Sequence, residues 1–264
     1  MCGRYIQVQS VETIEKRFNV KVPSGVELTP RFNIAPGQLA PVITGDNPKE
    51  VQLFQFGLTP FWAKKQMYLF NARSEGDKNK ENDPAYQGAK DIIAKPAFRK
   101  PIRSRRCLVI ADAFIEGPAK ERLSKPYVVY LKNHQGPFAF AGIWDTWIHK
   151  ETEETIHSFS IITTVANNLI QKIGHHRSPI ILPRRTEQKW LNPNTALTDI
   201  TQLLKPYPGD EMNAYPIAPE IKNPRAEGRH LVEPVGERLV PEYERNLKTE
   251  LELLGMGRYK RGEK

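Results

Sequence analysis

The stretch CLVIADAFIEG, residues 107–117, is a run of apolar residues that ends in a glutamate and a glycine. Its β-branched and aromatic residues and its glycine boundary are typical of a β-strand. We interpret Cys107, at the start of the run, as a small apolar residue of that strand. Glu116 comes at its end. The sequence therefore predicts a buried strand that carries an ionisable carboxyl group at one end.

Similar short apolar runs dominate the rest of the chain and predict further strands. They occupy residues 39–44, 51–56, 126–131, 138–144 and 157–165. Helical segments are fewer and are expected at residues 11–18, 165–173, 185–191 and 198–204. Ser10 directly precedes the first of these helices and suits an N-cap.

These elements predict an α+β fold. We expect a single domain with a mixed or antiparallel β-sheet or barrel-like core flanked by helices. The domain is expected to span residues 1–240. Residues 241–264 are expected to form a C-terminal helix, with proline in its first turn, and a basic tail.

The composition is that of an ordinary globular protein, with 264 residues, 39% hydrophobic and 26% charged. The first residues hold no apolar segment of a secretory signal. No uncharged apolar run approaches the roughly 18 residues needed to span a membrane. We therefore expect a cytoplasmic, nucleoid-associated protein with no membrane partner.

The chain carries a net charge of +9, which favours a polyanionic partner. Residues 95–106, KPAFRKPIRSRR, hold six basic residues and no acid. Two prolines in this stretch predict an extended loop rather than a helix. Both a solvated loop and a strip that tracks phosphates fit the pattern.

Only two cysteines occur, Cys2 and Cys107, and there is no Cys-x-x-Cys pair. Two are too few for a cysteine zinc site, and a single disulfide is uncommon in a large cytosolic chain. No three residues show metal-ligand spacing, so neither a metal nor a cofactor is expected.

Cys2 directly follows the initiator methionine. Once Met1 is removed, this residue presents an α-amine with a pKa of about 7.7–8.0 beside a thiol with a pKa of about 8.5. Such an aminothiol condenses with an aldehyde to an imine, and its thiolate then closes a five-membered thiazolidine. The alternative is that cysteine at position 2 is incidental.

Six motifs occur in order along the chain: MCGRY (1–5), RFNIAPGQLAPVI (31–43), FGLTPFWAKK (56–65), FNARSEG (70–76), CLVIADAFIEG (107–117) and IGHHRSPIIL (173–182). Together they closely resemble the SRAP family, the SOS response-associated peptidase-like proteins. The resemblance extends from Cys2 to about Glu233. It implies a sensor that crosslinks to abasic sites in single-stranded DNA and protects the lesion during the DNA damage response. It also implies thiol peptidase or lyase-like activity.

The resemblance assigns roles to residues that match the family motifs. Residues expected at the reaction are Cys2 as nucleophile, Asn71 beside the sugar, Glu116 as acid and His175. Residues expected to bind DNA are Arg4, Asn33, Pro36, Trp62, Arg73 and Arg177. Arg73 would bind phosphate and Trp62 would stack on a base. The implied partner is single-stranded DNA with an abasic site, bound by a monomer.

Three positions depart from the family pattern. Gly117 replaces a tryptophan after the glutamate, Phe56 replaces the tryptophan of a Trp-Gly pair, and Ser178 replaces a methionine. These changes affect the packing and aromatic lining of the nucleotide groove rather than the reacting groups.

The residue types suit this chemistry. Glu116 at the end of a buried strand is expected to have a raised pKa, because desolvation penalises its charge. His175 is expected to titrate near neutrality and to transfer protons on the sugar. Arg73 and Glu75 could form a surface ion pair instead of a functional site.

Two other functions remain open at this point. One is an N-terminal-nucleophile thiol hydrolase or peptidase that uses Cys2 with His175 and Glu116. The other is a non-catalytic module that binds single-stranded nucleic acid, in which Cys2 has no role.

Overall fold

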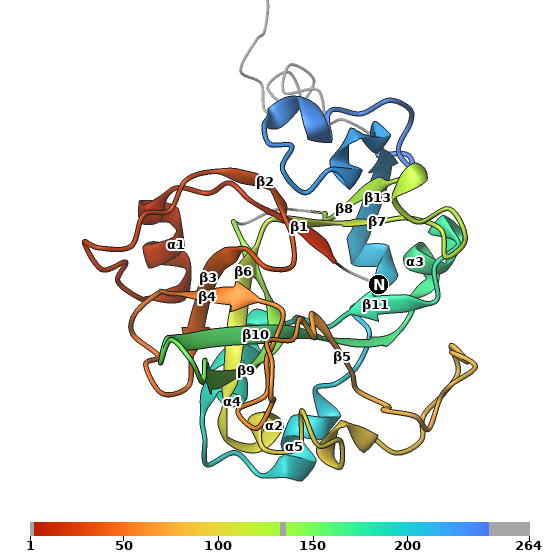
Figure 1. Ribbon diagram of the computed structural model, residues 1–264. Helices are drawn as coiled ribbons and strands as arrows, with labels where there is room; N and C mark the ends of the chain where they lie inside the picture. Colours follow the sequence, from red (N-terminus) through yellow and green to blue (C-terminus); the bar gives the residue numbers. More distant parts are fainter. Residues whose placement is uncertain (1–2, 133–135, 243–264) are drawn as a thin grey trace, which may run out of the picture.

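The computed structural model describes residues 3–132 and 136–242, and two β-sheets form its centre (Figure 1). The first sheet is antiparallel throughout, and its strands follow the order β13-β8-β7-β1-β2. Their bounds are Arg4–Gln7 for β1, Arg31–Ile34 for β2, Ala113–Glu116 for β7, Tyr127–Leu131 for β8 and Met212–Pro216 for β13.

The second sheet closes on itself. Strands β10, β4, β3, β6 and β9 each pair with the next, and β9 pairs again with β10. Their bounds are Leu39–Thr44 for β3, Gln52–Phe56 for β4, Arg106–Ala111 for β6, Phe138–Ile148 for β9 and Thr155–Val165 for β10. Short strands β5 (Asn71–Arg73), β11 (Arg177–Pro179) and β12 (Ile181–Leu182) attach to β10 and β9. The predicted α+β domain with a barrel-like core is confirmed.

Aromatic side chains couple the two sheets. The ring of Tyr5 on β1 lies 5.5 Å from that of Phe56 and 5.9 Å from that of Phe140, both edge to face. Phe114 on β7 also meets Phe140, at 5.9 Å. All four side chains are completely buried. Such pairs stabilise a core by about 0.5–1.5 kcal/mol beyond their buried area, so the first sheet is fixed against the barrel.

The predicted strand over residues 107–115 is two strands in the structure. β6 ends at Ala111 and β7 begins at Ala113. Between them, the Asp112 carboxylate accepts the backbone N–H of Val8 at 2.6 Å and that of Gln9 at 3.2 Å. The chain therefore changes from the barrel to the first sheet at Asp112, and a continuous apolar run cannot reveal that change. Cys107, as predicted, is a buried residue of this run and a free thiol.

Five α-helices among the described residues lie around the sheets (Figure 1). They are α1 (Val11–Phe18), α2 (Pro101–Ser104), α3 (Asn168–Ile173), α4 (Arg184–Leu191) and α5 (Leu197–Gln202). Ser10 caps α1 as predicted, since its side chain accepts the N–H of Thr13. The segment after β13 packs over β1 and β2. The predicted helix within 241–264 lies outside the described residues from position 243 onward, so that boundary stays a prediction.

The prediction of an extended loop for residues 95–106 is wrong. Pro101 begins α2, where its missing N–H interrupts no hydrogen bond. Four of the six basic side chains are bound within the protein: Lys95 by Asp91, Arg103 by the Ile93 carbonyl, Arg105 by Asp145 and Arg106 by the Trp190 carbonyl. Only Arg99 and Lys100 extend exposed from this stretch without such a bond, so it is a poor strip for phosphates.

Within the described residues, no helix is both long enough and apolar enough to cross a membrane.

Asn33 ties the start of the chain to a distant segment. Its completely buried side chain accepts a hydrogen bond from Arg4 Nη1 at 2.9 Å. Its amide donates to the carbonyls of Asn223 at 2.8 Å and Ala226 at 3.0 Å. Arg4 Nη2 also donates to the Lys222 carbonyl at 3.0 Å. Asn33 therefore orients Arg4 from behind and anchors residues 222–226.

Replacing Asn33 with alanine should remove three hydrogen bonds and leave buried partners unsatisfied. We expect a loss of about 1–3 kcal/mol in the free energy of unfolding, measured by urea denaturation. Asn194→Ala, at an exposed turn, is the control and should change it by less than about 0.5 kcal/mol. Equal effects of the two substitutions would contradict the anchoring role.

Candidate active site

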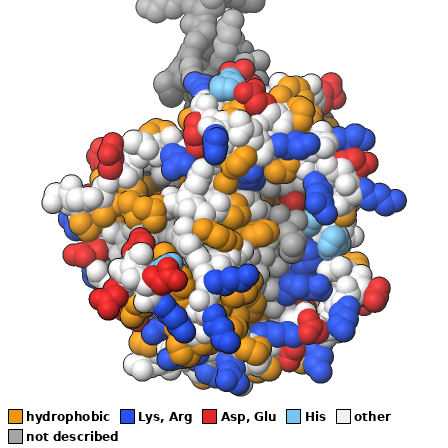
Figure 2. All heavy atoms as spheres, in the orientation of Figure 1, with side chains coloured by type: hydrophobic (Ala, Val, Ile, Leu, Met, Phe, Trp, Pro, Cys, Tyr) orange, Lys and Arg blue, Asp and Glu red, His pale blue; other side chains and the backbone are white. Residues whose placement is uncertain are grey.

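A cleft of about 660 Å³ lies where the two sheets meet. It is lined by residues from five places in the chain, namely Gly3, Arg4, Pro36, Phe70, Arg73, Glu116–Ala119, Arg122, Leu123, His175 and His176. Lys and Arg side chains gather on the face drawn in Figure 2, around and below its central depression. The cleft thus combines ionisable groups with a positively charged surrounding.

The pairing of β1 with β7 brings the start of the chain to this cleft. Arg4 lies opposite Ile115, and Tyr5 lies opposite Phe114. Continuing this antiparallel register by one residue sets Gly3 opposite Glu116. Cys2 lies outside the described residues, but it is bonded directly to Gly3, which lines the cleft.

Glu116 and His175 form a buried pair in the cleft. Glu116 Oε1 lies 3.6 Å from His175 Nε2, and each side chain is only 5% exposed. Burial raises the pKa of Glu116, as predicted from the sequence, although the Gly117 N–H donates to Oε1 at 3.3 Å and acts in the opposite direction. The Glu116 carboxyl group is therefore suited to hold a proton at a pH where an exposed glutamate has lost it.

His175 does not titrate near neutrality, so this expectation is wrong. Burial lowers its pKa to about 4, and the charge of Arg177 contributes to the shift. His175 Nδ1 lies 3.0 Å from the Arg177 carbonyl oxygen and 3.1 Å from the Arg177 backbone nitrogen. We assign the proton of the neutral ring to Nδ1, which donates to the carbonyl, so that Nε2 faces Glu116 as a proton acceptor. A spacing rule cannot reveal this, because the shift comes from burial in the folded chain.

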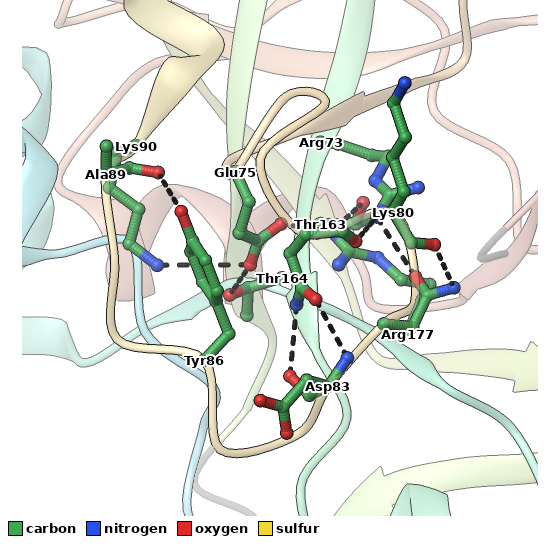
Figure 3. Close-up of polar contacts among 12 residues, drawn as sticks. Arg73, Glu75, Lys80, Asp83, Tyr86, Ala89, Lys90, Thr163, Thr164 and Arg177 are labelled. Carbon is green, nitrogen blue, oxygen red and sulfur yellow. Dashed lines mark hydrogen bonds and ion pairs between the residues drawn. The ribbon is translucent and has the colours of Figure 1, made fainter.

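Arg177 lies behind the cleft in a second buried pair (Figure 3). Its Nη2 lies 2.8 Å from Glu75 Oε2, and Thr164 donates to Glu75 Oε1 at 2.8 Å. The Glu75 side chain is 0% exposed and that of Arg177 is 2% exposed. Burial on its own would raise the pKa of Glu75, but the charge and hydrogen bond of Arg177 outweigh it and lower the pKa. The backbone of Arg177 meanwhile holds the His175 ring.

Arg73 lines the cleft and is oriented by the loop that follows β5. Its Nη2 donates to the Asn79 carbonyl and, at 3.1 Å, to Asn82 Oδ1 (Figure 3). Asn79 is buried and Asn82 has a left-handed backbone with φ of 58°. The loop therefore fixes the direction of the guanidinium. Glu75 pairs with Arg177 and not with Arg73, so the surface ion pair considered from sequence does not form.

The structure gathers some of the predicted site residues and separates others. Those that line the cleft are Arg4, Pro36, Arg73, Glu116 and His175. Asn71 is half-buried on β5 beside Ile161, and its amide donates to the Phe70 carbonyl at 3.1 Å. Asn33 and Arg177 are buried behind the lining residues. Their roles at DNA, and those of the lining residues, stay predictions.

Trp62 does not line the cleft and lies on a rigid exposed turn. Phe61 and Trp62 are 52% and 51% exposed. Asp145 accepts the Phe61 N–H at 2.9 Å, and Lys100 Nζ lies 4.8 Å from the centroid of the Phe61 ring. An exposed aromatic pair beside a lysine suits stacking on an unpaired base.

Sequence reasoning missed several residues of the cleft lining, among them Phe70, Arg122 and His176. The His176 ring stacks on that of His175 at 4.7 Å, with 16° between the ring planes. The paired histidines were visible in the sequence, but nothing marked the second as a lining residue. Arg122 belongs to no motif, and only the folded loop places it in the cleft.

Gly117 allows that loop to fold against the end of β7. A Cβ at this position would overlap the carbonyl oxygen of Arg122 and lie 3.0 Å from that of Lys125. The tryptophan that the family pattern places here could not be accommodated without moving the loop. The loop backbone at Arg122 and Lys125 therefore occupies the space that a side chain at position 117 would need.

No group of three His, Cys, Asp or Glu side chains that could hold a metal ion occurs in the described ranges.

The fold and the cleft agree with one family of proteins. Residues 1–224 match the model of the family described as SOS response associated peptidase (SRAP). The chain belongs to this family.

The curated relatives from Bacillus subtilis match over nearly their whole length. The abasic site processing protein YoqW of Bacillus subtilis (strain 168) is 33% identical over 241 residues, which is 88% of this chain and 99% of the relative. YoaM of the same organism, also an abasic site processing protein, is 34% identical over 88% of this chain and 98% of its own. The protein HMCES of Gallus gallus bears the same description and is 25% identical over 62% of this chain and 54% of its own.

Solved structures share the fold. A crystal structure of a protein from Bacteroides thetaiotaomicron aligns with a TM-score of 0.74 and 30% identity, over 89% of this chain and 100% of that one. A second, from Bordetella bronchiseptica, aligns with a TM-score of 0.63 and 22% identity, over 82% and 99%. The second shows likeness in fold alone.

Glu75→Gln should break the buried ion pair and leave the charge of Arg177 uncompensated. We expect a loss of about 3–5 kcal/mol in the free energy of unfolding at neutral pH. Because the pKa of Glu75 is lowered in the folded state, its stabilisation is complete above the ordinary pKa of about 4.3 and is lost as the pH falls through the folded value. The variant should therefore lose less stability than the wild type on acidification.

The measurement is urea denaturation at pH values from neutral to acidic. Glu27→Gln, at an exposed position, is the matched control and should behave like the wild type. Parallel pH curves for Glu75→Gln and the wild type would contradict the assigned pair.

Proposed function

We propose that this protein binds single-stranded DNA that contains an abasic site and forms a covalent thiazolidine crosslink with it through Cys2, protecting the lesion. The proposal rests above all on the register of β1 and β7, which directs the start of the chain to Glu116 in the cleft. It is supported by the relatives, which are named abasic site processing proteins.

The reaction requires removal of Met1, because only then does Cys2 carry a free amine beside its thiol. The amine attacks the aldehyde carbon of the open sugar, a C–N bond forms, and the carbonyl oxygen leaves as water to give an imine. The thiolate then adds to the same carbon, and the imine nitrogen takes up a proton. The overall balance is aldehyde plus aminothiol to thiazolidine plus one water.

Glu116 and His175 transfer protons in this reaction, Glu116 as the donor and His175 as the acceptor. Since burial raises the pKa of Glu116, its carboxyl group can donate a proton to the departing oxygen. His175, whose pKa is about 4, is uncharged at neutral pH and can accept the proton of the amine or thiol. General acid–base catalysis of this kind contributes about 10²–10⁴-fold.

DNA contacts are assigned to the cationic and aromatic surface around the cleft. Arg4 and Arg73 would bind phosphates, Pro36 would shape the groove, and Trp62 would stack on a base. Asn71 would contact the sugar by a small movement of β5. These contacts carry little base information, so we expect a preference for the lesion rather than for a sequence.

Asn33 and Arg177 are buried. They would support the site indirectly, since Asn33 binds Arg4 and the backbone of Arg177 binds the His175 ring. We propose that the protein acts as a monomer in the cytoplasm at the nucleoid.

A thiol peptidase or lyase-like activity is the second candidate. The family is described as a peptidase family, and the Glu116–His175 pair beside the chain start resembles the support of a cysteine nucleophile. Because the pKa of His175 is lowered to about 4, little imidazolium is present at neutral pH to protonate the leaving amine of a peptide, which favours the crosslinking reaction.

The crosslink is testable on a denaturing gel. The processed protein, incubated with a single-stranded oligonucleotide that holds one abasic site, should give a heat-stable adduct, and Cys2→Ala should give none. Cys2→Ser retains the amine and should give an adduct only after borohydride reduction of the imine. Cleavage of a peptide panel without any adduct would favour the peptidase instead.

Glu116→Gln should slow adduct formation by about tenfold or more, because the amide cannot donate the proton at the departing oxygen. Because burial raises the pKa of Glu116, the wild-type rate should fall when this carboxyl group ionises, and the variant should lack that pH dependence. Rates are measured by quenched time courses at several pH values.

Glu121→Gln is the control for that series, since Glu121 is an exposed glutamate in the following loop, 3.7 Å from Lys125. It should react at the wild-type rate. An unchanged rate for Glu116→Gln would rule out the role as acid.

A further inference from the structure

The loop after β7 holds an arginine in a backbone conformation that costs free energy. Arg122 lines the cleft and has φ of 53°. Left-handed φ values are uncommon for residues other than glycine, asparagine and aspartate, because the Cβ atom crowds the following carbonyl oxygen. Of the four such non-glycine residues in the described ranges, two are asparagines, and Arg122 alone lines the cleft.

The surrounding loop enforces this conformation. The Arg122 N–H donates to the Pro118 carbonyl at 2.7 Å, and the Ser124 N–H donates to the Glu121 carbonyl at 3.0 Å. Gly117 lacks the Cβ that would overlap the Arg122 carbonyl. Lys222 Nζ, on the segment that also holds Arg4, lies 3.2 Å from Ser124 Oγ. Strain that its surroundings maintain is typical of functional positions.

The guanidinium of Arg122 is available to a ligand. Within the described ranges, no hydrogen bond or ion pair engages its side chain, which is exposed at the cleft. The other two cleft arginines are partly used within the protein: Arg4 by Asn33 and Lys222, and Arg73 by Asn79 and Asn82.

Among the residues that the structure describes, no acidic side chain forms an ion pair with Arg122. Glu121 beside it in sequence is 3.7 Å from Lys125. Glu116 is the acid of the cleft lining, and burial disfavours its charged form. The side of the cleft next to Glu116 therefore carries an unbalanced positive charge with several open donors.

We propose that Arg122 binds a backbone phosphate next to the abasic nucleotide, on the Glu116 side of the cleft, and that the loop retains its left-handed conformation for this contact. This inference rests on the proposed function and adds a phosphate contact that no sequence motif marks. A guanidinium with open donors matches the phosphate oxygens by paired hydrogen bonds.

The test is non-covalent binding to a single-stranded oligonucleotide that carries a tetrahydrofuran abasic analogue, which has no aldehyde. Kd is measured at several salt concentrations for the wild type, Arg122→Asn, Arg122→Lys and Lys120→Gln. Asparagine tolerates the left-handed backbone and removes the charge. Lys120 is exposed on the same loop and does not line the cleft, so Lys120→Gln is the matched control.

Arg122→Asn should raise Kd about tenfold at low salt, as expected for one charge-assisted contact. The slope of log Kd against log salt should fall by about 0.7, the value for one phosphate contact on single strands. Its Tm should equal or exceed that of the wild type, because the strain is relieved. Arg122→Lys should keep the slope, and Lys120→Gln should change Kd much less than Arg122→Asn.

The inference would be overturned if Arg122→Asn had the same Kd and the same salt slope as the wild type. It would also be overturned if Arg122→Asn and Lys120→Gln lost the same amount of affinity. A slope in Arg122→Lys as low as in Arg122→Asn would also overturn it. If any of these contradicting results is found but the wild type still forms an adduct with an abasic oligonucleotide, only the proposed phosphate contact is refuted. If the wild type neither binds nor reacts, the proposed function fails, and the inference fails with it.

Discussion

The three paired positions between β1 and β7 determine where the chain begins relative to the only acid that lines the cleft in the described ranges. An antiparallel register admits no continuous adjustment, since a shift by one residue turns each side chain to the other face. Tyr5 and Phe114 bind this ladder to the barrel through their contacts with Phe140. Core packing therefore determines where the start of the chain lies. Gly3 lies at the cleft because Tyr5 is buried in the core.

Behind the cleft, two buried pairs serve different ends. The Glu75–Arg177 pair is charged and compensated, with a lowered pKa for Glu75. The Glu116–His175 pair is held in an environment that favours its uncharged forms, since burial raises one pKa and lowers the other. Arg177 links them, because its side chain binds Glu75 and its backbone holds the His175 ring. Because burial disfavours the charged form of both groups, a proton donor and a proton acceptor lie side by side.

The strands of the barrel could be predicted because apolar runs with turn residues at their ends are a local signal, as in β3 and β4. The break at Asp112 could not, since it depends on which sheet each half joins. Pro101 indicated a loop although it begins a helix. The motifs identified Glu116 and His175, but the pKa of His175 depends on burial that sequence does not record. Arg122 reaches the cleft through a loop conformation that no residue pattern marks.

The central claim is that the α-amine and thiol of Cys2 react at this cleft. Mass spectrometry of the adduct with an abasic oligonucleotide tests it most directly, both on the intact adduct and after digestion of its protein and DNA parts. The predicted mass of the intact adduct is that of the protein without Met1 plus that of the oligonucleotide, less one water. After digestion, the linked sugar should lie on the peptide that begins at Cys2. An adduct on a lysine peptide, or on protein that retains Met1, would contradict the account.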